Sequence, residues 1–264
     1  MPVSLHHVDL GGAGRPPLVI LHGLLGSSRN WQTAGRGLAA HFHVFALDAR
    51  NHGRSPHHAA MDYPAMAADV LAWLEARDMT SVTLLGHSMG GKTAMLLACR
   101  HPEKVGRLVV VDIASKNYQW AEHRSEFAAM NELELAGLSS RGEAEQRFES
   151  RVPDLGLRKF LVTNIERDGN GPWRWVINLP VLTGALPAME RDSLVAGDRF
   201  AGPALFLAGG RSRYVLPADH ARIQSHFPAA RIEVIAEAGH NPHLDRRDEF
   251  VRRVVEFAGA GSGG

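Results

Sequence analysis

Short apolar runs alternate with longer amphipathic segments along most of this chain, and the alternation limits the folds open to it. The apolar runs lie at 18–21, 44–47, 82–85, 108–111, 204–208 and 232–235. Each is short and almost wholly apolar, as expected of parallel strands covered on both faces. The intervening patterns predict helices at 28–40, 63–77, 89–101, 217–226 and 245–257. We therefore expect an α/β protein with one mostly parallel sheet and helices on both faces.

Two parts of the chain depart from this rhythm. Residues 4–10 alternate apolar and polar side chains, which predicts an edge strand that pairs antiparallel through the turn GGAGRPP. Residues 115–200 contain helical patterns without a strong strand run, and the rhythm resumes at Ala204. We expect 115–200 to be a helical cap inserted into a core formed by 1–114 and 201–258. The tail 259–264, GAGSGG, is expected to be flexible.

Composition excludes several classes of protein. The 264 residues are enough for one large domain, and 29 Lys and Arg against 28 Asp and Glu leave a net charge of +1. No strong field therefore favours nucleic acid or an anionic membrane, and a small-molecule substrate fits better. The single cysteine, Cys99, excludes an internal disulfide and a cysteine-rich metal site. Without an apolar run of ~18 residues or a signal peptide, we expect a soluble cytoplasmic protein with no stable membrane anchor. The sequence leaves the oligomeric state open.

The segment Gly86-His87-Ser88-Met89-Gly90 follows an apolar run and opens a helical pattern. The form G-x-S-x-G in a strand–turn–helix context predicts a nucleophile elbow with Ser88 as the nucleophile. A side chain at either glycine would crowd this sharp turn against neighbouring backbone. The alternative is that Ser88 only caps the helix. A serine hydroxyl is a weak nucleophile, so the hypothesis requires a base.

Of the fifteen histidines, His240 is the best placed to be this base. It follows the last apolar run and precedes the C-terminal helix, at the same carboxyl edge of the sheet as Ser88. The alternative is a loop histidine that caps a helix. His57 and His58 have no further ligands at recognisable spacing, so we expect no metal site.

The turn His22-Gly23-Leu24-Leu25-Gly26 also follows a strand run. It predicts an oxyanion hole formed by the backbone N–H of Leu24 and that of Met89, at the positive end of the next helix. We expect His22 to organise this turn by hydrogen bonding. Residues 48–55 are interpreted as another, mainly structural, wall of the site.

With HGLLGS, LDARNHGRSP, GHSMGGKTAM, VVVDIA and AGHNPH in this order, residues 18–257 resemble the α/β-hydrolases. The motifs look most like those of the YbfF-like bacterial esterases and their mitochondrial relatives. The resemblance implies a cofactor-free esterase acting on short acyl esters, or on acyl-CoA thioesters, beneath a helical cap. Ser212 stands where the wider superfamily has its triad acid. Asp112 matches the acid of the YbfF-like group, and its alternative role is to cap the start of the lid.

These features predict acyl transfer from a carboxylic ester through Ser88, Asp112 and His240. The alternatives are an acyl-CoA thioesterase, a longer-chain lipase-like hydrolase, and a ligand-binding module with very slow turnover. Ser88 argues against haloalkane dehalogenation, which uses a carboxylate nucleophile. We expect at least one of Trp120, Trp173 and Trp175 to line an apolar acyl pocket. The alternative is that all three only hold the cap together.

Overall fold

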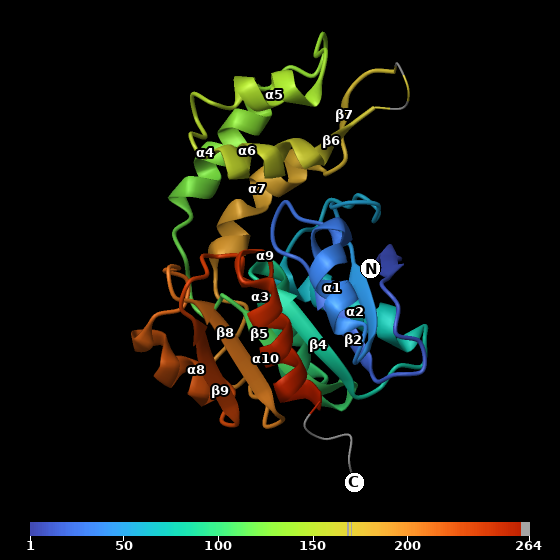
Figure 1. Ribbon diagram of the computed structural model, residues 1–264, viewed down its shortest axis with the longest axis vertical. Coiled ribbons are helices and arrows are strands. Elements are labelled where there is room, and N and C mark those ends of the chain that lie inside the picture. Colours follow the sequence, from blue (N-terminus) through green and yellow to red (C-terminus); the bar gives the residue numbers. More distant parts are fainter. Residues whose placement is uncertain (168, 170, 260–264) are drawn as a thin grey trace.

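The computed structural model describes residues 1–167, 169 and 171–259. A seven-stranded sheet in the order β1-β3-β2-β4-β5-β8-β9 forms its centre (Figure 1). All neighbouring strands are parallel except β1 and β3. The predicted α/β architecture is thereby confirmed. The strands are β1 (His7–Asp9), β2 (Pro17–Leu21), β3 (His43–Leu47), β4 (Val82–His87), β5 (Val105–Val111), β8 (Ala204–Gly209) and β9 (Ala230–Ile235).

Helices cover both faces of the sheet. They are α1 (Gln32–Leu38), α2 (Tyr63–Glu75), α3 (Met89–Arg100), α8 (His220–His226), α9 (Pro242–Asp245) and α10 (Arg247–Gly259), with short 3-10 turns η1 (Ser28–Trp31), η2 (Pro102–Lys104) and η4 (Pro217–Asp219). In β2, Leu18 and Ile20 face the core shared with α1 and α10, whereas Val19 and Leu21 face the core shared with α2 and α3. Burial on both faces explains why the strand runs are continuously apolar.

The structure corrects the predicted partner of the first strand. β1 is antiparallel and lies at the edge, as expected, but it pairs with β3 and not with β2 across the GGAGRPP turn. The reason is that β2 already lies between β3 and β4, which occupy both of its hydrogen-bonding edges. Elsewhere the predicted start of α2 is confirmed, because the Asp62 carboxylate accepts the N–H of Ala65.

Residues 115–200 contain most of the elements that lie apart from the sheet, beyond the carboxyl ends of its strands (Figure 1). They are α4 (Ala121–Glu132), α5 (Arg141–Arg147), α6 (Leu155–Leu161), η3 (Val162–Asn164), β6 (Ile165–Glu166), β7 (Arg174–Trp175) and α7 (Leu179–Glu190). We call this segment the cap. The hairpin β6–β7 was not expected, because strands of two residues leave no apolar run.

At the C-terminus the expected flexible tail is partly corrected. Gly259, its first residue, is the last residue of α10, whose apolar face packs against the sheet. Residues 260–264 lie outside the described residues. Within the described residues, no helix combines the length and apolar character needed to cross a membrane.

Candidate active site

Ser88 occupies the sharp turn between β4 and α3. Its φ is 50° and its ψ is −117°, a conformation that residues with a side chain rarely adopt. Such strain is typical of functional sites, where the surrounding fold holds it in place. The Ser88 side chain makes no capping hydrogen bond to α3, so the alternative of a simple helix cap gains no support.

The two glycines of the elbow allow its close contacts. A Cβ on Gly86 would lie 2.2 Å from the carbonyl oxygen of Gly90, and a Cβ on Gly90 would lie 2.3 Å from that of Leu21. Real Cβ atoms do not approach backbone oxygen so closely. The predicted crowding is therefore confirmed, and the turn packs directly against β2.

Asp112 follows β5 at the same edge of the sheet, also with a positive φ of 48°. Its carboxylate is fully buried and accepts the Nδ1–H of His240 at 2.7 Å. The Gly209 N–H (2.9 Å) and the Ser212 hydroxyl (2.5 Å) also donate to it. Because Nδ1 of His240 carries the proton, its Nε2 is left with a free lone pair. This is the tautomer that a general base requires.

Three other acids, Asp48, Asp219 and Asp245, have different partners. Asp48 accepts the N–H groups of Ser28 and Arg54, Asp219 pairs with Lys116, and Asp245 accepts the N–H of Gly239. Among the described contacts, Asp112 is the only acid that hydrogen-bonds the His240 ring. Ser212, at the superfamily position of the acid, donates a hydrogen bond to Asp112, a role that sequence reasoning did not foresee.

His87 holds the loop that carries His240. Its Nε2–H donates to the backbone carbonyl of His240 at 2.8 Å, and the two rings lie 4.8 Å apart. Burial lowers the pKa of His87 well below its usual value, so this imidazole stays neutral. No hydrogen bond between Ser88 and His240 occurs among the described contacts; such bonds are often long until substrate is present.

The predicted oxyanion turn lies against the nucleophile, since a Cβ on Gly23 would be 3.3 Å from the Cβ of Ser88. His22 organises this turn as expected. Its Nδ1–H donates to the Gly23 carbonyl at 2.7 Å, and its Nε2 accepts the N–H of Ala49 at 2.9 Å. The turn is also held from the cap, because Asn164 donates to the carbonyl of Leu25 at 3.0 Å.

The two expected oxyanion donors are therefore on segments that meet at Ser88. Met89 is the first residue of α3, where an N–H has no partner within the helix. Within the described part of the chain, neither the Met89 N–H nor the Leu24 N–H makes a hydrogen bond to another protein atom. Both N–H groups remain available for a substrate oxygen.

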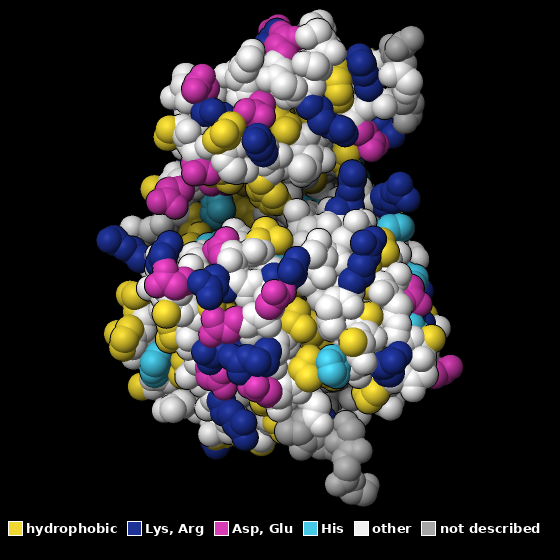
Figure 2. Space-filling view, in the orientation of Figure 1, with side chains coloured by type: hydrophobic (Ala, Val, Ile, Leu, Met, Phe, Trp, Pro, Cys, Tyr) yellow, Lys and Arg dark blue, Asp and Glu magenta, His cyan; other side chains and the backbone are white. Residues whose placement is uncertain are grey.

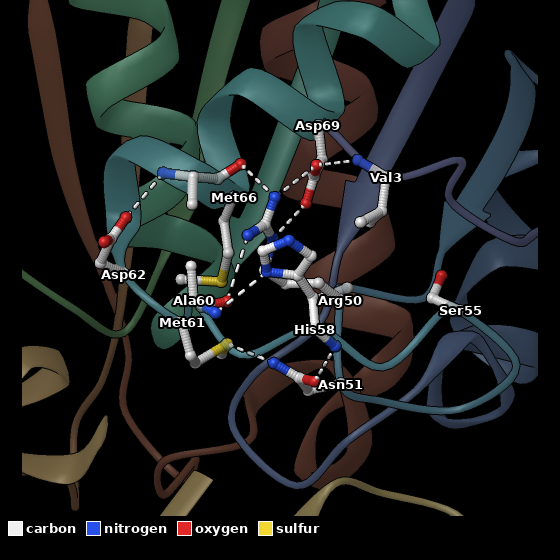
Figure 3. A network of polar contacts seen from close by, with 12 residues as sticks. Val3, Arg50, Asn51, Ser55, His58, Ala60, Met61, Asp62, Met66 and Asp69 are labelled. Carbon is white, nitrogen blue, oxygen red and sulfur yellow. Dashed lines mark hydrogen bonds and ion pairs between the residues drawn. The ribbon is translucent and has the colours of Figure 1, made fainter. Parts of the chain in front are cut away.

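Residues 48–55 form a polar wall joined to this turn through Ala49, and their polar side chains are buried except that of Arg54. Figure 3 shows the contacts of Arg50 and Asn51 in this wall. The Arg50 guanidinium binds both oxygens of the Asp69 carboxylate at 2.6 and 2.7 Å, and both side chains are 1% exposed. Its remaining N–H groups donate to the carbonyls of Ala60 and Ala65. Removing one partner would leave a buried unpaired charge, so the pair stabilises the wall only as a complete unit. These contacts support the interpretation that the polar groups of the wall are mainly structural.

Tyr214 is the main active-site residue that sequence reasoning did not single out. Its ring stacks on the His240 imidazole, with centroids 3.8 Å apart and planes within 19°. Its backbone carbonyl accepts the Tyr118 hydroxyl at 2.7 Å, and its own hydroxyl lies 3.5 Å from Nε2 of His123 in α4. Only its place in the loop after β8, beside Ser212, could have suggested this contact.

The three predicted pocket tryptophans have different surroundings. Trp120 is buried, packs edge-on against His123 at 5.2 Å, and lies 6.1 Å from the ring of Tyr118. Trp173 donates its indole N–H to the Leu138 carbonyl inside the cap, and Trp175 belongs to the β6–β7 hairpin. Trp120 thus shares two neighbours, Tyr118 and His123, with Tyr214. Among the described contacts, neither Trp173 nor Trp175 touches Ser88 or His240. The pocket role of all three remains a prediction.

The surface is hollowed between the cap and the core, with hydrophobic and histidine side chains inside the hollow (Figure 2). Elsewhere, the Nε2 atom of the largely exposed His57 bonds the carbonyl of Val176. Across residues 1–167, 169 and 171–259, no cluster of three or more His, Cys, Asp or Glu side chains is arranged to hold a metal ion.

Known proteins resemble this chain over most of its length. A family model described as "alpha/beta hydrolase fold" matches residues 16–247. The sn-1-specific diacylglycerol lipase ABHD11 of Xenopus tropicalis is 40% identical, over 94% of this chain and 79% of that protein. Esterase YbfF of Escherichia coli (strain K12) is 35% identical, over 91% of this chain and 92% of its own length.

Solved structures show the same likeness. The structure described as a marine microorganism esterase has a TM-score of 0.93 and 35% sequence identity, and covers 97% of this chain and 99% of its own.

Proposed function

The chain belongs to the α/β-hydrolase fold family, and we propose that it is a serine esterase that cleaves carboxylic esters through Ser88, Asp112 and His240. One observation carries the proposal: a buried carboxylate fixes Nδ1 of His240 at 2.7 Å, at the sheet edge where strained backbone presents Ser88. This arrangement matches what a serine nucleophile needs, namely a base and a group that orients the base.

In the proposed mechanism, Nε2 of His240 takes the Ser88 proton as Oγ attacks the ester carbonyl carbon. Asp112 stabilises the resulting imidazolium, and the backbone N–H groups of Leu24 and Met89 bind the oxyanion of the tetrahedral intermediate. The imidazolium then gives its proton to the leaving alcohol, which departs as the acyl-enzyme forms. Water, activated by His240, attacks the acyl-enzyme and releases the carboxylic acid and free Ser88.

For the substrate we propose small-molecule esters with short acyl chains, bound between a core of residues 1–114 and 201–258 and a cap of residues 115–200. Two observations support this choice: the hollow beneath the cap, and the 35% sequence identity with Esterase YbfF, 92% of whose length is matched. A longer-chain lipase-like activity is the second candidate, because the 40% identical relative is named an sn-1-specific diacylglycerol lipase. For the location we propose the cytoplasm, because a chain with a single cysteine needs no oxidising compartment to form an internal disulfide.

The test is hydrolysis of p-nitrophenyl esters of increasing acyl length, alongside acyl-CoA thioesters, by wild type and Ser88→Ala. We expect turnover of the short esters and a loss of several orders of magnitude in the folded variant. Near-normal turnover by folded Ser88→Ala would refute the assignment of the nucleophile.

A fluorophosphonate probe separates the esterase from a ligand-binding module with the same triad. Rapid labelling of Ser88 together with fast ester turnover supports the enzyme. Tight retention of the ligand with slow turnover supports the binding module.

A further inference from the structure

Lys92 is a buried charged side chain that the proposed mechanism does not use. Lys92 lies on α3 one turn after Ser88, and its backbone N–H donates to the backbone carbonyl of Ser88 at 3.0 Å. The residue is 0% exposed. Lysine is almost never fully buried unless its ammonium is paired, because desolvating an ion is costly. Its partners therefore indicate what it does.

The Lys92 ammonium lies at the C-terminal end of the cap helix α7. Its Nζ is 2.6 Å from the carbonyl oxygen of Arg191, 3.4 Å from that of Glu190 and 3.5 Å from that of Met189. The last carbonyls of a helix lack intrahelical partners and carry the negative end of the helix dipole. A cation with three donors suits this position.

Three aromatic rings surround the same ammonium. Their centroids lie at 4.9 Å for Tyr118, 5.3 Å for Tyr63 and 5.7 Å for Trp120, within the range of cation–π attraction. Tyr118 and Trp120 belong to the segment that leads from the core into α4. Lys92 thus contacts both connections of the cap, the one before α4 and the one after α7.

The two connections are also joined to each other and to the catalytic histidine. The backbone N–H of Tyr118 donates to the Glu190 carbonyl at 2.8 Å, and that of Trp120 to the Glu190 carboxylate at 2.9 Å. The Tyr118 hydroxyl donates to the Tyr214 carbonyl, and the Tyr214 ring stacks on His240. A shift of these connections would therefore change the space beside His240.

We propose that Lys92 is a positioning residue whose side-chain amine holds both connections of the cap against the nucleophile helix and thereby limits the acyl-chain length that the cleft admits. The inference rests on the proposed esterase function for its substrate. Its mechanical part, a clamp on the cap, rests only on the contacts of Lys92.

The surroundings of Lys92 make the clamp sensitive to pH. Burial lowers the pKa of Lys92 to about 7; the carboxylates of Asp192 and Glu190 oppose this shift, and Lys116 adds to it. Tyr63 and Tyr118, the other titratable groups facing the ammonium, are neutral because burial raises the pKa of both. A loosened cap would expose the amine to water and return its pKa toward the ordinary 10.5, so the loosened state binds the proton more tightly than the clamped one. As the pH falls through about 7, protonation of Lys92 therefore favours the loosened state and longer chains enter. Above this pH the neutral amine keeps its hydrogen bond to the carbonyl of Arg191.

The test is the ratio of kcat/KM for p-nitrophenyl octanoate to that for p-nitrophenyl acetate, measured from pH 6 to 8.5. Protonation of His240 affects both substrates alike and cancels in the ratio. In the wild type we expect the ratio to fall about threefold or more as the pH rises, centred near pH 7, because the charged form of Lys92 favours the loosened cap. In Lys92→Met, which keeps the length of the side chain without its N–H donors, the ratio should be high at every pH.

Arg100→Met is the matched control on the same helix. Arg100 also reaches the connection after α7, through Asp198 at 2.7 Å, but its side chain is 53% exposed and makes no described contact with residues 116–121 or with the end of α7. The loss of such an exposed pair should leave the ratio and its pH dependence unchanged. A flat ratio in the wild type, or a wild-type profile in Lys92→Met, would overturn the proposal. The wild-type profile decides even if Lys92→Met fails to fold.

Hydrogen exchange separates failure of the clamp from failure of the esterase assignment. Peptides spanning 116–121 and 188–192 should exchange faster at pH 6 than at pH 8.5, after correction for intrinsic rates. At pH 8.5 they should also exchange faster in Lys92→Met than in Arg100→Met. Equal protection in these comparisons would refute the clamp. If the protein hydrolyses no ester but shows the exchange difference, the esterase assignment and the chain-length role are refuted, whereas the clamp on the cap is supported.

Discussion

Replacing Asp112 by Asn preserves the size of the side chain and turns one acceptor oxygen into a donor. In the structure one oxygen of Asp112 accepts the Gly209 N–H, and the other accepts both the Ser212 hydroxyl and Nδ1–H of His240. An Asn side chain can satisfy only one of these two sides with its single oxygen. The outcome depends on which way the amide turns.

Turning its NH₂ group toward Gly209 would oppose two donors in a fully buried site, at a cost of about 1–3 kcal/mol. We therefore expect the NH₂ group to face His240, where it forces Nδ1 to accept and moves the ring proton to Nε2. That tautomer cannot take the proton of Ser88. The loss in the corresponding serine-protease variant is ~10⁴-fold, or about 5 kcal/mol in the activation barrier.

The assay is kcat/KM on a short p-nitrophenyl ester, with circular dichroism to show that each variant is folded. Ser212→Ala is the matched control, because it removes one donor to Asp112 and leaves the tautomer of His240 unchanged. We expect it to lose roughly 10- to 100-fold at most. The reasoning fails if Asp112→Asn stays within about tenfold of wild type, or if Asp48→Asn or Asp219→Asn loses the activity in its place.

Activity should fall as the pH is lowered, because only neutral His240 can act as a base, and EDTA should have no effect; recovery that requires added metal would contradict the mechanism. Trp120→Ala should change the preferred acyl length, whereas Trp173→Ala, bound within the cap, should lower only the melting temperature; an identical chain-length profile for both would contradict this. The His243 ring is stacked on the Trp31 ring with centroids 4.0 Å apart, and burial lowers the pKa of His243 to about 3 from an ordinary 6.5. As the pH falls, this histidine therefore takes up a proton in the unfolded chain before it does so in the folded one. The stability that the neutral His243 contributes is lost as the pH falls below about 6.5. The difference in unfolding free energy between pH 7 and pH 5, measured with urea, should shrink by about 2 kcal/mol in His243→Phe, and an unchanged difference would disprove the shift.

Local sequence patterns were sufficient for much of the fold. Continuous apolar runs identified the strands β2 to β5 and β8 because burial on both faces allows little else at those positions. The elbow could be predicted because its two glycines and Ser88 are close in sequence. The contact that excludes a Cβ at Gly86 arises within the turn itself, whereas that at Gly90 comes from β2, the neighbouring strand of the sheet. In the same way, Asp62 could be recognised as a cap from its place before a helical pattern.

Contacts between distant segments were beyond such patterns. The partner of β1 depended on which strand had a free edge, and that is a property of the whole sheet. Tyr214 on His240, Ser212 on Asp112 and Lys92 under α7 each join residues from separate elements. These contacts cannot be predicted from the residues next to each side chain in the sequence, because the contacts depend on how the strands, the cap and its connections pack. The sequence by itself therefore determined the elements and the chemical types at their ends, whereas tertiary packing decided which of those groups touch.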